Sequence, residues 1–238
     1  MTTMLPTILA IDTSAELAST ALLVGDRVLS RESSGVHTHS HAILPLVQSL
    51  LQEAGIALAQ CDAIAFGSGP GSFTGVRTAC GIVQGLAFGA NVPVIPVVTL
   101  LAMAQKCRID SGAVNVLAVL DARMGEVYWA QYRYADGWQT VIAPTLSTAD
   151  AVTPQGQVVV CGNGLTAYAE AFEQSGLRAH SHPHLYPLIM PHAVQVAELG
   201  RIAFALDQTL PARDAQPLYL RNKVALTTAE RKLKAEAA

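Results

Sequence analysis

A glycine-rich stretch, GSGPGSFTGVRTACG, runs from Gly67 to Gly81 and is the first candidate for chemistry, because such loops often bind phosphate. Neither standard phosphate motif fits it. A Walker loop needs Lys and then Ser or Thr after its last glycine, whereas Gly75 is followed by Val-Arg. The glycine spacing also departs from GxGxxG. Two interpretations stay open: a turn in which Ser72 or Thr74 caps the next helix, or an anion site at that helix N-terminus.

A second candidate is Asp12, which ends an apolar run and is followed by Thr13 and Ser14. A carboxylate at a strand end could hold a magnesium–phosphate group, or it could cap a hairpin turn. The spacing does not separate the two. Asp12, Ser72 and Thr74 are therefore weak candidates for cofactor contact, and we expect no tightly bound cofactor.

Alternating histidines occur twice in the chain: His37, His39 and His41, and then His180, His182 and His184. Imidazoles two residues apart in an extended segment point the same way and could share a metal ion. No acidic residue or cysteine stands beside either group, and a proline interrupts the second. We therefore expect loop histidines and no metal site. A hydrolase triad is equally unsupported, because the GxSxG nucleophile motif is missing from the sequence.

The elements that must position these residues follow from periodicity. Short β-rich runs joined by tight turns predict an antiparallel three-stranded start over residues 8–11, 19–24 and 27–32. Apolar residues at helical spacing and short apolar runs then predict a helix at about 40–54, a strand at 63–66, a helix at about 72–89, a strand at 93–97 and a short helix at 100–106.

The second half repeats this order in part. Its predicted elements are strands at 114–120, 126–134 and 158–161 and helices at 166–174 and 192–206. The partial repeat predicts an α/β protein with two related subdomains, 1–108 and 109–238. The helix near 192–206 is a candidate to pack back on the first subdomain, and a polar tail begins at about residue 221.

Composition indicates a partner. Hydrophobic residues make up 51% of the chain and charged ones only 14%, whereas an ordinary soluble domain has about 25% charged residues. So few charges suit a surface that another protein covers. The net charge of −3 argues against broad capture of nucleic acid by this chain alone. The apolar runs are too short for a membrane span, and the cysteines form no CxxC pair, so we expect a cytoplasmic protein.

The helix predicted at 72–89 carries almost no charge. Its glycines recur every four residues at Gly81, Gly85 and Gly89, which leaves a flat track for close approach of another helix. A helix that is apolar nearly all round is typically buried on two sides. One side can pack on the chain's own sheet. The other side fits a partner, or alternatively the helix lies at the centre of one large core.

Five stretches together carry a family resemblance: IDTS (11–14), HSHAILP (39–45), GPGSFTGVR (69–77), DARMGEVY (121–128) and PLYLR (217–221). In this order, over nearly the whole chain, they resemble the TsaB (YeaZ) family. The resemblance implies the actin/sugar-kinase/Hsp70-like fold with two ribonuclease-H-like subdomains, the second reduced. It also implies a scaffold subunit required for N6-threonylcarbamoyladenosine next to the tRNA anticodon, one that binds TsaD and helps recruit TsaE.

The resemblance further implies that the chain is not an enzyme. TsaD holds its metal through a His-x-x-x-His pair, and the corresponding positions here are Thr99 and Met103, a hydroxyl and a thioether that cannot replace two imidazoles. ATP or ADP is then expected only in the complex with TsaD and TsaE, and tRNA contact only through that complex. The alternative is an ATP-dependent phosphotransferase or hydrolase of the same fold, built on Asp12 and the glycine loop.

The partner surface is predicted on the two helices of the first half. TsaB and TsaD are similar there and should pair helix to helix, and the same surface could pair with itself to form a homodimer. The residues predicted for this interface are Leu44, Val47, Leu51, Thr78, Ile82, Gly85 and Gly89.

Overall fold

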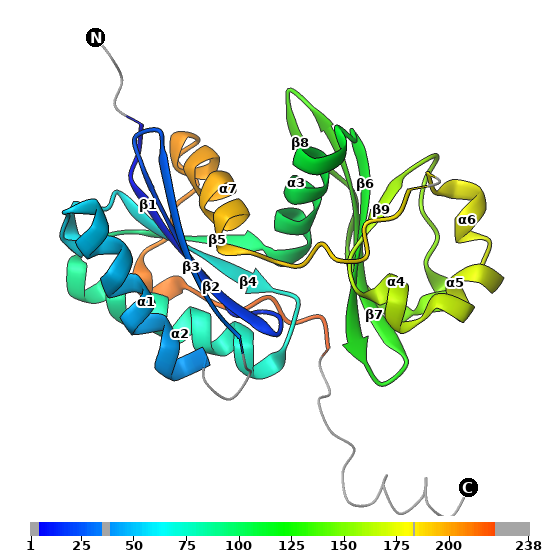
Figure 1. Cartoon of the computed structure of the whole chain (residues 1–238), viewed down its shortest axis with the longest axis horizontal. Coiled ribbons are helices and arrows are strands. Elements are labelled where there is room, and N and C mark those ends of the chain that lie inside the picture. The colour runs from blue at the N-terminus through cyan, green and yellow to red at the C-terminus, as the bar shows by residue number, and fades with distance from the viewer. Residues whose placement is uncertain (1–4, 35–38, 183, 222–238) are drawn as a thin grey trace, which may run out of the picture.

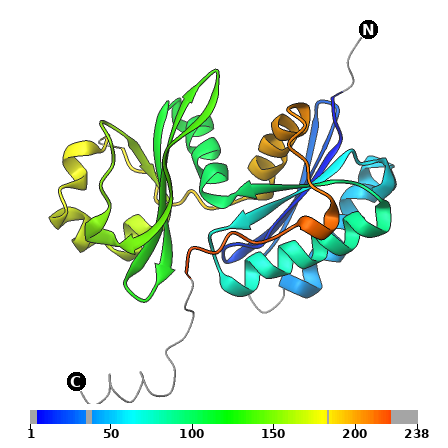
Figure 2. The ribbon, with the colours of Figure 1, turned by 180° about the vertical axis from the view of Figure 1, so that it is seen from behind.

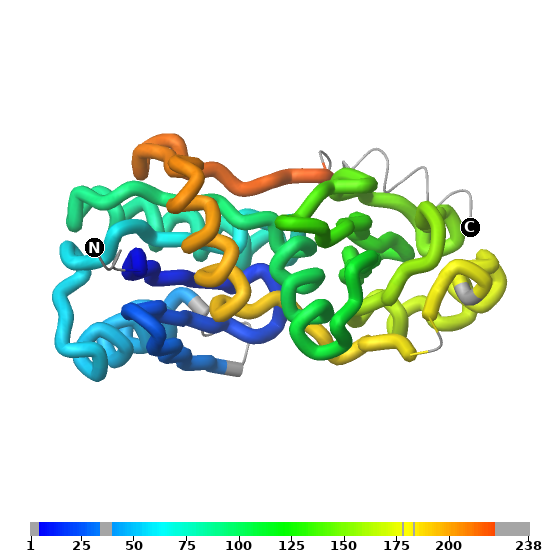
Figure 3. The backbone as a smooth tube through the Cα atoms, turned by 90° about the horizontal axis from the view of Figure 1, so that it is seen from above, coloured from blue at the N-terminus to red at the C-terminus, as the bar shows by residue number. Residues whose placement is uncertain are grey.

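The structure, a computed structural model, describes residues 5–34, 39–182 and 184–221. His37 and the predicted tail beyond residue 221 lie outside the described residues. Two lobes lie side by side, each built on its own sheet (Figure 1). Viewed from above, the molecule is elongated along the line that joins the two lobes (Figure 3).

The first lobe holds a five-stranded sheet of order β3-β2-β1-β4-β5. Its strands are β1 (Ile8–Asp12), β2 (Leu17–Val24), β3 (Arg27–Ser34), β4 (Ala63–Gly69) and β5 (Val94–Val98). The first three pair antiparallel, which confirms the predicted antiparallel start, and β4 and β5 run parallel to β1.

Helices cover both faces of this sheet. On one face lie α1 (His39–Ala54) and α2 (Phe73–Ala90), and on the other lies α7 (Ala193–Ala205). Successive strand residues point to opposite faces, so Leu9 and Ile11 pack with α1 and α2, whereas Ile8 and Ala10 pack with α7. Two single-turn helices, η2 (Leu58–Gln60) and η4 (Ala212–Asp214), complete the lobe.

The second lobe repeats this arrangement with fewer elements. Its sheet has the order β8-β7-β6-β9, which matches β3-β2-β1-β4 without a fifth strand. The strands are β6 (Asn115–Arg123), β7 (Glu126–Ala135), β8 (Gly137–Thr148) and β9 (Val159–Cys161). Its helices are α3 (Thr99–Ser111), η3 (Ala149–Ala151), α4 (Gly164–Ala167), α5 (Ala169–Gln174) and α6 (Leu177–His180). The predicted fold class is observed, with the second lobe reduced.

Three elements differ from the sequence prediction. Strand β8 was not predicted, because it is an edge strand with few buried residues and gives a weak alternating pattern. Helix α3 runs on to Ser111 and ends at Gly112, whose φ of 72° is left-handed. The helix predicted at 166–174 is two helices, α4 and α5, which meet at Tyr168, where φ is −131° and ψ is 39°.

The chain crosses between the lobes more than once. The boundary predicted between residues 108 and 109 falls inside α3, which contacts both sheets. Helix α7 packs on β1, β2 and β4 of the first lobe. From there residues 215–221, here called the C-terminal strap, run along α2 and back toward the second lobe (Figure 2).

Candidate functional site

The glycine loop (Gly67–Gly75) packs directly on the Asp12–Ser14 turn. An added Cβ at Gly67, Gly71 or Gly75 would lie 1.9, 2.4 or 1.8 Å from an atom of that turn. The obstacle is backbone at Gly71 and Gly75 and the buried Asp12 carboxylate at Gly67, so a side chain at any of these positions would have to displace part of the turn. The loop and the turn therefore fill the space between them with their own atoms.

Three backbone N–H groups of this loop donate hydrogen bonds within the chain. Ser72 N donates to the carbonyl oxygen of Ser14 at 2.7 Å, and Gly69 N donates to Thr99 Oγ1 at 3.1 Å. Gly75 N donates to Ser72 Oγ at 3.4 Å, which makes Ser72 the N-cap of α2 and confirms one of the two predicted caps. A phosphate would need such donors for itself. The N–H groups of Gly69, Ser72 and Gly75 are therefore part of a structural junction.

Asp12 also has a local role. Its side chain is fully buried, and Oδ1 accepts hydrogen bonds from the N–H of Ser14 at 3.0 Å and from Ser14 Oγ at 2.8 Å. These are the contacts of a turn-capping aspartate. Thr74, the third weak candidate, is exposed in the first turn of α2, where its carbonyl accepts from the hydroxyl of Thr78 at 2.9 Å.

A cleft of about 340 Å³ opens between the lobes. Its walls come from the glycine loop, the β6–β7 turn and the C-terminal strap, and they include Ser72, Phe73, Tyr128, Asn163 and Tyr219. Asp12 and Thr74 are not among the lining residues. Mixed apolar and polar walls of this size suit a small ligand or an inserted side chain.

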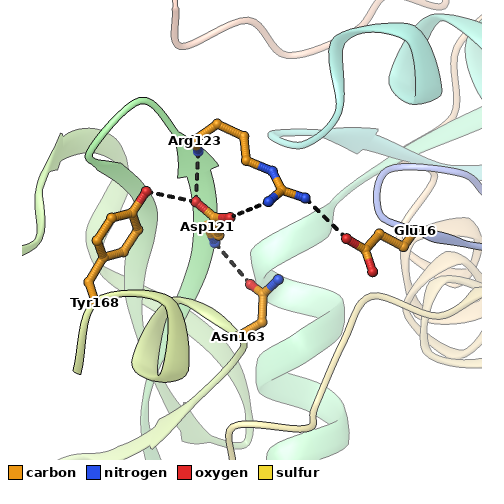
Figure 4. A network of polar contacts seen from close by, with 5 residues as sticks. All are labelled: Glu16, Asp121, Arg123, Asn163 and Tyr168. Atoms are coloured by element: carbon orange, nitrogen blue, oxygen red, sulfur yellow. Dashed lines mark hydrogen bonds and ion pairs between the residues drawn. The ribbon is translucent and has the colours of Figure 1, made fainter.

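A polar network joins the two lobes beside this cleft (Figure 4). Asp121 Oδ1 accepts from Tyr168 Oη at 2.9 Å and from Arg123 N at 2.7 Å, while Asp121 N donates to Asn163 Oδ1 at 2.9 Å. The Arg123 guanidinium lies 3.2 Å from Asp121 and 3.0 Å from Glu16 of the first lobe. Burial, and then the hydrogen bond to Asp121, raise the pKa of Tyr168, so its hydroxyl stays protonated and donates.

The turn that presents this network is strained. Arg123 and Met124 have φ values of 61° and 59°, in the left-handed region that non-glycine residues seldom adopt. Met124 is 71% exposed. Sequence reasoning predicted only a turn at 121–125. The available signal was the motif DARMGEVY, which places two charged residues in a tight turn between strands.

The two positions that correspond to the TsaD histidines lie in the core. Thr99 and Met103 are both fully buried. The Thr99 hydroxyl accepts the Gly69 N–H, and the terminal methyl of Met103 lies 2.5 Å from where a Cβ on Gly162 would stand. Both side chains therefore hold β4 and β9 against α3.

The described histidines do not form a cluster of ligands. His41 is exposed in α1. The rings of His182 and His184 are 5.6 Å apart, and His184 N donates to His182 Nδ1 at 3.3 Å. Within the part of the chain that the structure describes, no three His, Cys, Asp or Glu side chains are grouped so that they could hold a metal ion.

The predicted partner surface is exposed along the glycine track of α2 and at Leu44 of α1. A Cβ added at Gly81, Gly85 or Gly89 would meet nothing within 4 Å, so all three glycines face outward from α2. Leu44 of α1 is 49% exposed, and Phe88, which sequence reasoning did not single out, is 84% exposed. We call this α1–α2 surface the outer face.

The structure corrects one residue of this surface. Val47 is 3% exposed and packs in the core beneath α1, so it does not belong to the outer face. Leu51, Thr78 and Ile82 are half-buried, and Leu51 and Ile82 pack against that same core. A groove of about 510 Å³ runs beside α1, with Leu44, Leu51 and Leu86 among its walls.

Membrane insertion was a further question raised by the apolar composition. Among the described residues, none of the helices has both the length and the apolar character that crossing a bilayer requires.

Comparison with known proteins identifies the family. The family profile described as TsaD, tRNA N6-adenosine threonylcarbamoyltransferase, matches residues 28–222. The Escherichia coli (strain K12) protein named tRNA threonylcarbamoyladenosine biosynthesis protein TsaB is 39% identical over 225 residues, which cover 92% of this chain and 96% of that protein. The protein of the same name from Haemophilus influenzae is 38% identical, with coverages of 92% and 94%.

Solved structures agree with the sequence relatives. YeaZ from Pseudomonas aeruginosa superposes with a TM-score of 0.80 at 38% identity, covering 90% of this chain and all of that one. A second structure, described as an uncharacterized protein with similarity to peptidase YeaZ from Pseudomonas aeruginosa, has a TM-score of 0.81 at 38% identity and covers 91% of this chain. The chain belongs to the TsaB (YeaZ) family of tRNA threonylcarbamoyladenosine biosynthesis proteins.

Proposed function

We propose that this chain is a non-catalytic subunit in the formation of N6-threonylcarbamoyladenosine in tRNA, that it pairs with TsaD through the outer face, and that it helps recruit TsaE in the cytoplasm. The observation that carries the proposal is the open glycine track: Gly81, Gly85 and Gly89 all face outward with no atom within 4 Å of an added Cβ. Such a track leaves room for the backbone of a second helix at close range.

The exposed apolar side chains on the outer face support protein pairing. Phe88 and Leu44 flank the glycine track and are 84% and 49% exposed. Exposed aromatic and aliphatic side chains beside a flat surface are typical of an interface core. A second copy of this chain carries the same outer face and can pair through it, so self-association competes with TsaD binding.

The burial of Thr99 and Met103 supports a non-catalytic role. Both lie in the core, and neither hydroxyl nor thioether supplies the imidazole pair that TsaD uses. The packing of the glycine loop on the Asp12–Ser14 turn supports the further proposal that the isolated chain holds no nucleotide tightly, and that ATP or ADP binds only in the complex with TsaD and TsaE.

A peptidase is the second candidate, because one similar structure carries that word in its description. Among the residues that the structure describes, the serine hydroxyls beside the cleft bond to groups other than a histidine. Ser14 Oγ donates to Asp12, and Ser72 Oγ accepts from Gly75 N. A serine nucleophile requires a histidine base within hydrogen-bond reach. These contacts favour the subunit over the peptidase.

The test is reconstitution with purified TsaD, TsaE and unmodified tRNA. We expect TsaD to be retained by the immobilised chain, and modified tRNA to form only when TsaD is present. Calorimetry of the isolated chain with magnesium and ATP should show no binding. Nucleotide binding by the isolated chain, or product without TsaD, would instead favour the phosphotransferase or hydrolase.

A further inference from the structure

We propose that the second lobe controls the position of α2 through the C-terminal strap, and that Tyr219 and Arg221 are positioning residues for partner binding at the outer face. The inference rests on the proposed pairing with TsaD. The inference gives the reduced second lobe a role in partner binding, although the outer face itself is formed by α1 and α2 of the first lobe.

The strap is hydrogen-bonded to α2 at three successive turns. Arg77 Nε donates to the hydroxyl oxygen of Tyr219 at 2.6 Å. One turn on, Cys80 Sγ contacts the carbonyl oxygen of Ala215 at 3.4 Å, and Gln84 Nε2 donates to the same oxygen at 3.0 Å. The strap therefore follows the helix over much of its length rather than touching it at one point (Figure 2).

Aromatic stacking strengthens the contact at the start of α2. The Arg77 guanidinium carbon lies 3.5 Å from the ring centroid of Phe73 and 5.2 Å from that of Tyr219. The two rings are 6.1 Å apart. Arg77 thus contacts one ring in the first turn of α2 and one ring in the strap, and this exposed contact couples the two segments.

The other end of the strap is fixed to the second lobe. Arg221 Nη2 lies 2.5 Å from Glu126 Oε2 at the start of β7, and Arg221 Nη1 donates to Met124 Sδ at 3.8 Å. The Arg221 side chain is only 16% exposed. A pair this well covered holds its geometry better than a solvated surface pair does.

Helix α2 therefore carries both the residues that contact the strap and the glycines of the outer face. The strap side carries Arg77, Cys80 and Gln84, and the outer face carries Gly81 and Gly85. Because a helix moves as a unit, displacement of the strap side displaces the glycine track by a similar amount. Close helix packing tolerates little displacement, since dispersion contacts weaken steeply with a small gap.

The Figure 4 network also joins the lobes, but by a different route. Arg123 pairs with Glu16 in the turn between β1 and β2 and with Asp121 of β6. That network fixes the lobes to each other. The strap connects the second lobe to α2, and it is also anchored to β4, because Leu218 N donates to the carbonyl oxygen of Ser68 at 2.7 Å.

The experiment measures TsaD affinity by calorimetry for three variants of the full chain. Arg221→Glu and Glu126→Arg each place like charges together, and each should weaken TsaD binding by about tenfold. The combined Arg221→Glu/Glu126→Arg variant restores an ion pair of reversed sense and should return the affinity to near the native value. Arg213→Ala removes an arginine that is 84% exposed just before the strap, and it should change nothing.

Hydrogen exchange of the isolated chain separates this inference from the proposed function. Without TsaD present, Arg221→Glu should speed exchange of the α2 amides relative to Arg213→Ala, and the combined variant should reverse the change. Native exchange and native TsaD affinity in both single variants would overturn the inference, as would failure of the combined variant to rescue either. A native chain that does not bind TsaD would overturn the proposed function, while the exchange data would still test the strap.

If Arg221→Glu lowers the urea midpoint of the whole protein, TsaD affinity is measured for the Tyr219→Phe variant instead. It removes only the hydroxyl that accepts from Arg77 Nε and keeps the ring stack. We expect about threefold weaker TsaD binding and only a small fall in the urea midpoint, because one exposed hydrogen bond contributes little to the stability of the whole chain. Native affinity in this variant would overturn the inference.

Discussion

Thr13 and Gly75 are held together through their backbones and one side chain. Thr13 Oγ1 donates to the carbonyl oxygen of Gly75 at 2.6 Å, and a Cβ on Gly75 would stand 1.8 Å from the carbonyl oxygen of Thr13. This contact joins the β1–β2 turn to the start of α2. It gives Gly75 a structural role, because the backbones of the turn and the helix are in direct contact there.

Gly75→Ala should therefore destabilise the fold severely. The obstacle is a backbone carbonyl in a packed junction, which cannot rotate away as a flexible side chain would, so we expect a loss of about 3 kcal/mol or more. Urea unfolding followed by circular dichroism measures it.

Gly85→Ala is the matched control, because the same substitution in the same helix meets no atom within 4 Å. It should stabilise the isolated chain by about 0.5–1 kcal/mol, the usual gain of alanine over glycine in a helix. Equal stability of the two variants would contradict the packing described here.

Much of the first lobe could be predicted from its sequence, because the local signals agree with the fold. The hairpins of β1 to β3 follow from short β-rich runs and tight turns, and the observed cap of α2, Ser72, is one of the two predicted candidates. Strand β8 was missed because an edge strand buries too little to impose a strict alternation.

The site was harder to predict, because it depends on which distant segments meet. Glycine spacing could not show that the loop rests on Asp12, and the periodicity of α1 could not show which edge of its apolar stripe turns inward. Val47 was therefore placed on the partner surface although it is 3% exposed, and Phe88 was overlooked. The cleft network was missed because Glu16 and Arg123 are far apart in the sequence.

The stability of the protein should fall in alkaline solution through Cys61. Burial, helped by the neighbouring Asp62 carboxylate, raises the pKa of the Cys61 thiol from 9.0 to about 11. The unfolded chain then releases this proton at a lower pH than the folded one. Stability is full below about pH 9 and is lost as the pH rises toward 11.

The measurement compares urea midpoints of the native chain and Cys61→Ala from about pH 8 to pH 10.5. The midpoint of the native chain should fall further over this range. Burial also raises the pKa of Tyr128 and Tyr132, but both proteins share that contribution, so their difference isolates Cys61. Parallel pH profiles would show that the thiol is not held protonated by the fold.

Restoring the histidine pair should not restore chemistry. Thr99→His with Met103→His places two imidazoles in a fully buried core and removes the hydroxyl that accepts the Gly69 N–H. We expect no threonylcarbamoyl transfer to tRNA by the isolated variant, because metal ligands also need supporting partners. We also expect a loss of about 3 kcal/mol of stability. Thr99→Ser, which keeps the hydroxyl, should stay close to native. Transfer by either protein without TsaD would refute the non-catalytic assignment.

Replacing His37 and His41 together with alanine should leave folding and metal content unchanged. His41 is exposed in α1, and His37 lies outside the described residues. Elemental analysis of the purified native chain and the double variant measures the zinc content of each. One equivalent of zinc in the native chain, lost in the variant, would establish a metal site that we do not expect.

The outer face should fail as a partner surface when its shape or polarity is changed. Gly85→Leu puts a large side chain on the glycine track and should push a partner helix away, while Leu51→Glu leaves a charge buried beneath the partner at a cost of about 3–5 kcal/mol in binding. Both variants should stay folded yet lose TsaD in pull-down and size-exclusion experiments, and tRNA modification with it.

The matched controls are Gly137→Leu, where an added Cβ also meets nothing within 4 Å, and Leu188→Glu, at a side chain that is 91% exposed. Both controls lie away from α1 and α2 and should bind TsaD normally. If TsaD is still retained by Gly85→Leu and Leu51→Glu, the interface lies elsewhere on the molecule.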